Sequence, residues 1–348
     1  MKKIVMGEKW TLLAKPGFGR QQSVNKIIEE NKPNFDAVME MDLNFTAPLG
    51  VFLHLCNRML SGIGDENMNG AMSRPNTNYM MILNPLFSSL RSKKILFIFY
   101  HPEQVYSGNQ WLDKNWGQFF IQFLPSDFTA CVFVSSNASI QLSPDHLVFK
   151  PDVSENPVAA VAYICKQLNV KFLPENMRDD VSYNRFLEQI FQTYWKSLDE
   201  FTRSKLAFYS GALHVISKRF IDREDEKIKL VLTELTAPKI DGFVLDDWIG
   251  KLIYGNLTST ERKFIHAEWA KKLALTPRNP HHPETWALHH HLFFSQQFLD
   301  SIDLLNEIVD DQLNMDIDGY LPRILHEYDE AKLSEDLERE IDDIRDLL

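Results

Sequence analysis

Close to its beginning the chain reads KWTLLAKPGFGRQQS over residues 9–23. Residues 9–13 are apolar enough to predict a short buried strand, and the Pro/Gly run over residues 14–20 predicts a loop. Residues 21–31 then follow a helical period, with three apolar residues on one face (Val24, Ile27 and Ile28). A strand, a glycine-containing loop and a helix therefore open the chain.

This arrangement has the frame of a phosphate-binding loop, whose pattern is G-x-x-x-x-G-K-[ST] between a strand and a helix. Its glycines let backbone N–H groups surround a phosphate at the helix N-terminus. Its lysine contacts the β- and γ-phosphates, and its Ser or Thr hydroxyl holds Mg²⁺. A Pro-Gly-x-Gly turn that merely joins a strand to a helix is the structural alternative.

Only part of that pattern is present here. Ala14 stands at the first glycine position, Arg20 at the lysine position and Gln21 at the hydroxyl position. Arginine keeps the positive charge as a planar fork, and glutamine is a poor ligand for a hard cation. The candidate nucleotide-binding residues of this altered (degenerate Walker A) loop are Gly17, Phe18, Gly19, Arg20, Gln21 and Gln22.

Further strands and helices alternate along the first 170 residues. Strands are predicted over residues 35–42, 95–100, 130–134 and 147–149, and helices over residues 48–59 and 111–124, with a mobile loop at residues 62–77. The run over residues 95–100 is apolar without interruption, which is typical of a strand covered on both faces. The pattern predicts an α/β domain with a parallel sheet and helices on both faces.

Two strand ends carry the other positions of a nucleoside-triphosphatase. Tyr100 and His101 follow the apolar strand where an acidic pair (Walker B) is expected, so no carboxylate is supplied there. Glu103 is close in sequence, but it follows Pro102, and we expect its side chain to point elsewhere.

The strand over residues 130–134 runs into the third element of such enzymes. Ser135, Ser136 and Asn137 follow it, where signal-transduction NTPases carry a Thr/Ser-Ser-Arg sensor of the γ-phosphate. Asn137 replaces the arginine, so this position is altered too.

Beyond residue 170 the pattern becomes helical. Helical spacing covers residues 181–220, a turn at Asp241 leads into a short strand, and Thr258 caps a helix that ends at Leu273. Two helices are expected over residues 284–296 and 299–311. An acidic helix capped by Ser334 ends the chain, and its apolar stripe comprises Leu337, Ile341, Ile344 and Leu348.

In order and spacing these elements resemble the STAND class of P-loop NTPases, which includes NB-ARC-like and MalT-like regulators. Residues 252–266 look like the end of that class's winged-helix segment, and residues 282–305 look like the start of a tetratricopeptide-type (TPR) array. The resemblance implies an ADP/ATP switch. It divides the chain into a degenerate P-loop domain (1–170), a helical and winged-helix-like domain (171–275), and a TPR-like hairpin with the acidic helix (276–348).

Composition excludes several other classes. A formal charge of −11 argues against a nucleic-acid-binding surface. No apolar run approaches a membrane span and no signal peptide is evident, so we expect a cytoplasmic protein. Three widely spaced cysteines lie in apolar runs and predict small buried side chains. The histidines near residues 281–291 point in different directions on a helix, so we expect no metal site.

Three hypotheses follow. The first is a regulator or scaffold, possessing no catalytic residues, that binds a protein partner through its C-terminal helices; bacterial signalling or defence is implied by resemblance alone. The second is a divergent switch that still binds ATP or ADP, either without Mg²⁺ or with Glu103 serving the metal. The third is an enzyme with a new site near His101.

Overall fold

The computed structural model describes residues 3–14, 20–44, 48–73, 79–136, 147–149, 164–166, 168–170, 180–212, 216–239, 242–245, 247–312 and 320–346. Its first part is built on a five-stranded parallel sheet in the order β2-β3-β6-β1-β7. The strands are β1 (Lys9–Leu13), β2 (Ala37–Asp42), β3 (Ile95–Tyr100), β6 (Ala130–Ser135) and β7 (Leu147–Phe149).

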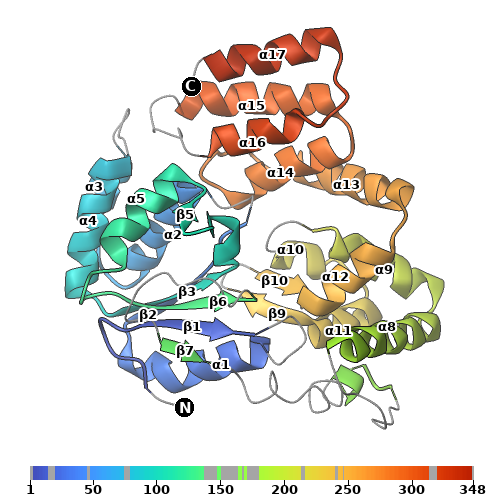
Figure 1. Ribbon diagram of the computed structural model, residues 1–348, viewed down its shortest axis with the longest axis horizontal. Coiled ribbons are helices and arrows are strands. Elements are labelled where there is room, and N and C mark those ends of the chain that lie inside the picture. Colours follow the sequence, from blue (N-terminus) through green and yellow to red (C-terminus); the bar gives the residue numbers. More distant parts are fainter. Residues whose placement is uncertain are drawn as a thin grey trace.

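Helices cover both faces of this sheet (Figure 1). On one face lies α1 (Arg20–Asn31), whose Val24 and Ile27 pack with Leu12, Ile98 and Val132 of the strands. On the other face lie α2 (Leu49–Gly62), α4 (Tyr79–Ser92) and α5 (Lys114–Phe123). Because successive side chains of a strand point to opposite faces, β3 needs apolar residues at every position, and all six are buried.

Aromatic rings fill the second face. Phe52 of α2 lies 6.0 Å from Phe97 and 5.9 Å from Phe99 of β3, measured between ring centroids. It also lies 5.2 Å from Trp116 and 5.1 Å from Phe119 of α5. Tilted and edge-to-face pairs at these distances stabilise a core beyond the area they bury. The ring of Phe52 in α2 therefore packs against both β3 and α5.

The middle of the chain is mainly helical, with one small sheet. Its helices are α8 (Asp180–Ser197), α9 (Glu200–Ser210), α10 (Lys218–Ile221), α11 (Glu226–Leu235) and α12 (Asp247–Asn256). Its strands β8 (Ile216–Ser217), β9 (Thr236–Lys239) and β10 (Gly242–Leu245) pair antiparallel in the order β8-β10-β9. Gly242 permits the pairing, because a Cβ there would lie 2.1 Å from the Ile216 carbonyl oxygen.

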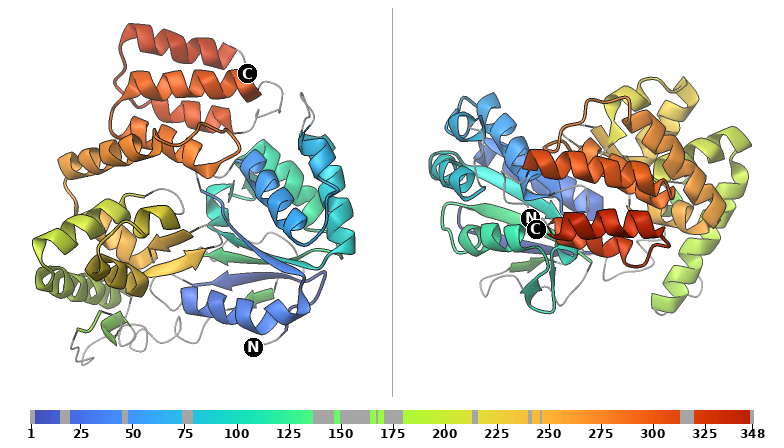
Figure 2. Two further views of the ribbon diagram at one scale, coloured as in Figure 1. Left: turned by 180° about the vertical axis from the view of Figure 1, so that it is seen from behind. Right: turned by 90° about the horizontal axis from the view of Figure 1, so that it is seen from above.

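The last part is all helical and comprises α13 (Ser259–Leu273), α14 (Pro283–Phe294), α15 (Phe298–Gln312), α16 (Leu321–Tyr328) and α17 (Glu335–Asp346). These helices lie across one end of the molecule, beside both preceding parts (Figures 1 and 2). His281 stacks on His54 of α2 at 3.9 Å between ring centroids, and Arg323 donates to the Gln104 carbonyl oxygen at 3.0 Å. Side chains from both ends of the chain therefore form this junction.

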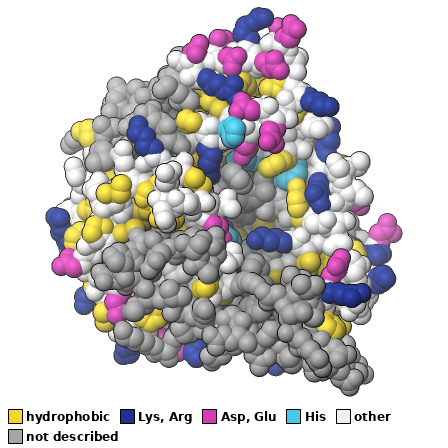
Figure 3. Space-filling model, in the orientation of Figure 1, with side chains coloured by type: hydrophobic (Ala, Val, Ile, Leu, Met, Phe, Trp, Pro, Cys, Tyr) yellow, Lys and Arg dark blue, Asp and Glu magenta, His cyan; other side chains and the backbone are white. Residues whose placement is uncertain are grey.

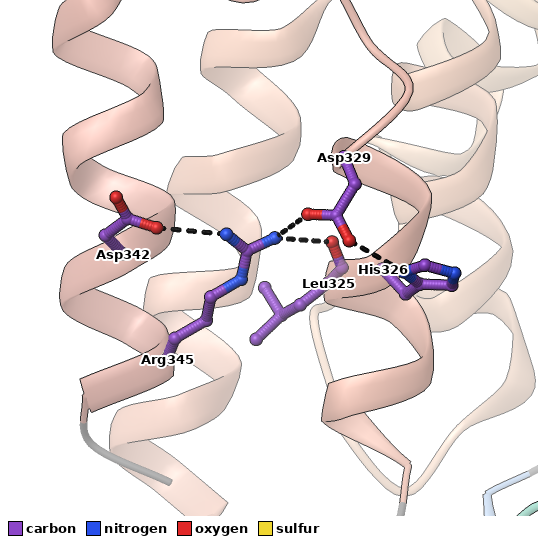
Figure 4. Close-up of polar contacts among 5 residues, drawn as sticks. All are labelled: Leu325, His326, Asp329, Asp342 and Arg345. Atoms are coloured by element: carbon purple, nitrogen blue, oxygen red, sulfur yellow. Dashed lines mark hydrogen bonds and ion pairs between the residues drawn. The ribbon is translucent and has the colours of Figure 1, made fainter.

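A polar cluster fixes α17 against α16 (Figure 4). Arg345 donates to the Leu325 carbonyl oxygen at 3.2 Å and pairs with Asp329, while Asp342 pairs with the same guanidinium at 3.0 Å. His326 lies 2.6 Å from the second oxygen of Asp329. Arginine suits this position because its planar fork serves several acceptors at once.

The α/β fold with a largely helical second half confirms the predicted fold class. Thr258 caps α13 in a capping box with Glu261, as expected. The three cysteines are buried and free, also as expected. Of the acidic helix's stripe, Ile341 and Ile344 are buried, whereas Leu348 lies outside the described residues.

Several local predictions were wrong. Within the predicted loop at residues 62–77, α3 (Asn69–Met72) forms, packed on α4; residues 74–77 lie outside the described residues. Gln110–Trp111 is a strand, β5, that pairs with β4 (Tyr106–Ser107), so α5 begins only at Lys114, where Asp113 caps it. The span 181–220 contains two long helices and the short β8, because Asp199 starts a new helix. Other elements were not predicted, among them α4, β4, β9 and α16. Among the described helices, none is long and apolar enough to cross a membrane.

Replacing Phe52 with alanine tests the aromatic core. We expect Phe52→Ala to lower the free energy of unfolding by about 3–5 kcal/mol, since the cavity cannot be filled by the surrounding rings. Ile121→Ala, at an exposed position of α5, is the control, and it should change stability by less than about 0.5 kcal/mol. Denaturant unfolding followed by tryptophan fluorescence measures both, and equal effects would contradict this packing.

Candidate functional site

The carboxyl ends of β1, β3 and β6 meet at one edge of the sheet. In the register of the strands, Leu13 pairs with Ser135 and Tyr100 pairs with Val134. In open α/β sheets, ligands bind outside this edge. The altered phosphate loop after β1, the altered acidic pair after β3 and the altered sensor after β6 therefore lie at the same edge, because parallel strands end on the same side of a sheet.

The first of these positions is only partly described. Gly17, Phe18 and Gly19 lie outside the described residues, as does the side chain of Gln22. Arg20 is the first residue of α1 and is buried. Its Nη2 lies 3.5 Å from Nε2 of His101. The charged group at the lysine position is thus directed along the edge of the sheet toward the end of β3.

His101 follows β3 in a left-handed conformation, with φ at +52°. Histidine tolerates this region better than bulkier or β-branched residues. Its N–H donates to the Val134 carbonyl oxygen at 3.1 Å, and its Nδ1 lies 2.9 Å from Oδ1 of Asp42 at the end of β2. A carboxylate can only accept, so Nδ1 carries the proton, which leaves Nε2 as the acceptor facing Arg20. The three side chains form one chain of polar contacts across the strand ends.

Tyr100 points to the face covered by α1. Its hydroxyl donates to Glu40 of β2 at 2.5 Å. Burial, and then the adjacent carboxylate of Glu40, raise the pKa of Tyr100 well above its usual value, while a hydrogen bond with Gln21 opposes the shift. The phenol is consequently neutral and already bonded.

Glu103 lies in η2 (Pro102–Gln104), and its position corrects the expectation that it points elsewhere. Its two carboxylate oxygens accept from the hydroxyls of Ser135, at 3.1 Å, and Ser136, at 3.2 Å. The short helical turn after Pro102 brings the carboxylate back to the end of β6. Asn137, the last predicted sensor residue, lies outside the described residues.

Two further residues belong to the site, and sequence reasoning missed both. Asp42 ends β2, and the only signal for it is its place as the last residue of a predicted strand. Lys251 comes from α12, in the helical part. Desolvation lowers the pKa of Lys251 and so does Arg20, whereas Glu103 and Asp42 raise it. Nothing in the sequence around Lys251 indicates this approach, because it depends on how α12 is placed against the sheet.

The carboxylates nearest the strand ends are hydrogen-bonded to other groups of the chain. Tyr100 is neutral and bonded to Glu40, and Asp42 serves His101. Glu103 is the nearest carboxylate to the sensor serines, but both its oxygens accept hydroxyl hydrogens. Mg²⁺ demands oxygen ligands free to form an octahedral shell. The assignment of residues 17–22, 100–101 and 135–137 to nucleotide handling stays a prediction.

The second polar cluster lies among the C-terminal helices and consists of buried histidines. Nδ1 of His266 lies 2.8 Å from Nδ1 of His291, and its Nε2 lies 2.8 Å from the Tyr254 hydroxyl. His289 contacts the Tyr328 hydroxyl at 2.9 Å. No group of three metal-ligating side chains with suitable geometry occurs in the described part of the chain. These rings bridge helices as polar parts of the core.

The same fold occurs in a known protein. A crystal structure of a Signal Transduction ATPase with Numerous Domains (STAND) with a tetratricopeptide repeat sensor, from Pyrococcus horikoshii, matches with a TM-score of 0.52 and 12% sequence identity. The match covers 88% of this chain and 48% of that one, so this chain spans about half its length. No protein-family model and no curated protein matches the chain. The chain thus resembles that protein in fold over the matched region, and at 12% identity the likeness shows the fold alone.

The stacked pair of His54 and His281 makes stability depend on pH. Burial, and then His281, lower the pKa of His54 to about 3. In the unfolded chain a histidine takes up its proton at a pKa of about 6.5, so the unfolded state binds more protons as pH falls below that value. Stability is therefore fully present above about pH 6.5 and is lost as pH falls toward 3.

His54→Phe removes one titrating ring and keeps an aromatic ring beside His281. We expect the variant to lose less stability than the parent chain between neutral and mildly acid pH. Denaturation midpoints of the parent chain and of His54→Phe, each measured at neutral and at mildly acid pH, test this expectation. An identical pH dependence of the two proteins would show that His54 is not held neutral by the fold.

Proposed function

We propose that this protein is a regulator or scaffold built on a P-loop-type domain that does not hydrolyse nucleotide. The observation that carries the proposal is the Arg20–His101–Asp42 chain across the strand ends. Phosphoryl transfer needs a cation on the phosphates and a carboxylate for the metal. Here Arg20, which stands at the lysine position, and Asp42, the carboxylate at the end of β2, both contact His101.

The proposal assigns separate roles to the predicted domains, which cover residues 1–170, 171–275 and 276–348. The P-loop-type domain provides the rigid base, and the C-terminal helices bind a protein partner. The TPR sensor named for the Pyrococcus horikoshii protein supports this role, because α13, α14 and α15 pack successively on one another. Bacterial signalling or defence is the setting that the STAND resemblance suggests.

A divergent nucleotide switch is the second candidate, and Glu103 favours it. The carboxylate lies beside Ser135 and Ser136, where a sensor of the γ-phosphate is expected. Rotation of the two hydroxyls would free its oxygens for a cation. Lys251 of α12, whose charge interacts with those of Glu103 and Asp42, would then add a positive charge.

An enzyme centred on His101 is less well supported. Asp42 orients the ring as a general base requires, at 2.9 Å from Nδ1. The atom that would take up the proton is Nε2, however, and the guanidinium of Arg20 faces it at 3.5 Å. The guanidinium therefore occupies the position from which a substrate would have to deliver its proton to Nε2.

Titration calorimetry with ATP and ADP, with and without Mg²⁺, together with a phosphate-release assay, tests the proposal. We expect no Mg²⁺-dependent turnover. Mg²⁺-dependent binding with turnover would contradict the proposal, and Mg²⁺-dependent binding without turnover would favour the divergent switch.

If nucleotide binds without Mg²⁺, Arg20→Ala should abolish the binding, because it removes the only cation in the predicted phosphate loop that the structure describes. Lys26→Ala is the matched control, since it removes one positive charge from an exposed position on the same helix. Binding that survives Arg20→Ala, or that both variants lose equally, would place the nucleotide elsewhere.

A further inference from the structure

A groove runs between α13, α14 and α15, away from the sheet edge. It encloses about 320 Å³ and opens to solvent. Ala270 of α13, Ala274 at the C-terminal cap of α13, and Leu288 and Leu292 of α14 are its apolar lining residues. The space stays open because the two alanine side chains are too small to fill it.

The rim of the groove is charged. Lys271 and Arg278 lie on the α13 side, but Lys271 pairs with Glu268 at 2.6 Å and Arg278 pairs with Glu307 across the groove. Asp300 and Asp303 lie on the α15 side. Within the described residues, no ion pair or hydrogen bond engages either carboxylate. The basic groups of the rim are thus paired within the described part of the chain, whereas Asp300 and Asp303 are not.

The C-terminal segment that contains α15, α16 and α17 is negatively charged, like Asp300 and Asp303 at the rim. Residues 298–348 contain 17 Asp and Glu but only 4 Lys and Arg, in a chain whose net charge is −11. The excess of negative charge therefore resides in this last segment. Figure 3 shows Asp and Glu side chains gathered over the upper helices of the molecule. A field of one sign at a groove attracts a ligand of the opposite sign and repels phosphates.

We propose that this groove binds a short cationic segment of a partner protein. One or two aliphatic side chains of the segment contact the apolar lining residues, and flanking Lys or Arg residues pair with Asp300 and Asp303. The distance from Asp300 to Glu307 is two helical turns, or about 10 Å, which accommodates only a few residues. The inference deepens the proposed function, on which it rests, by stating the chemistry of the partner.

Fluorescence polarisation on the full chain tests this with a short labelled peptide composed of Lys and Leu, at about 0.15 M salt to screen diffuse attraction. We expect saturable binding. The same peptide with Glu for every Lys, or with Ser for every Leu, should not bind, because the first is repelled by the rim and the second has nothing to bury.

Two variants locate the site. Asp303→Lys should weaken binding at least about tenfold, since it reverses a charge at the rim. Asp343→Lys, on the exposed face of α17, changes net charge equally and should leave affinity unchanged within about twofold. Ala274→Trp should abolish binding by filling the groove. Thermal unfolding of each variant confirms that it folds.

Absence of binding by the Lys–Leu peptide would overturn the inference. So would equal weakening by Asp303→Lys and Asp343→Lys, which indicates diffuse attraction, or full binding by folded Ala274→Trp. These outcomes are independent of nucleotide. ATP hydrolysis together with the expected peptide binding would contradict only the proposed function. Absence of both ATP hydrolysis and peptide binding would contradict only the proposal that the groove binds a cationic segment.

Discussion

Burial of the central parallel sheet on both faces is the constraint on which the rest of this structure depends. β3 lies between β2 and β6, and all six of its residues are buried. A strand in that position must be covered by helices on each side, which places α1 on one face and α2, α4 and α5 on the other. The same parallel arrangement brings the carboxyl ends of β1, β2, β3 and β6 to one edge. The site is thus a consequence of how the core is buried.

At that edge the chain satisfies its polar groups internally. Arg20, His101 and Asp42 contact one another in series, and Glu103 accepts from two serine hydroxyls. Paired and hydrogen-bonded groups are the arrangement that keeps charges stable at a partly buried place. A site that handles phosphate would instead hold such groups ready for an incoming ligand. This difference supports the proposal that the chain keeps the fold without hydrolysing nucleotide.

The C-terminal helices share one apolar cluster with the two preceding parts of the chain, and polar and aromatic contacts add to it. His54 stacks on His281, and Arg323 reaches the Gln104 carbonyl oxygen directly after β3. Because Gln104 adjoins Glu103, the helical end of the molecule touches the loop that shapes the site.

The sequence by itself determined the strand–loop–helix opening, the buried strands β3 and β6, and the altered identities of residues 20, 21, 100 and 101. These features are local, because apolar runs and helical periods are written in neighbouring residues. The tertiary structure alone decided that Asp42 meets His101, that Glu103 turns back to Ser135, and that Lys251 approaches from α12. Those contacts join residues far apart in the chain, and their formation depends on strand register and helix packing. The spacing of residues along a sequence determines neither strand register nor helix packing. The altered loop was therefore predictable, whereas the residues that contact Arg20, Ser135 and His101 were not.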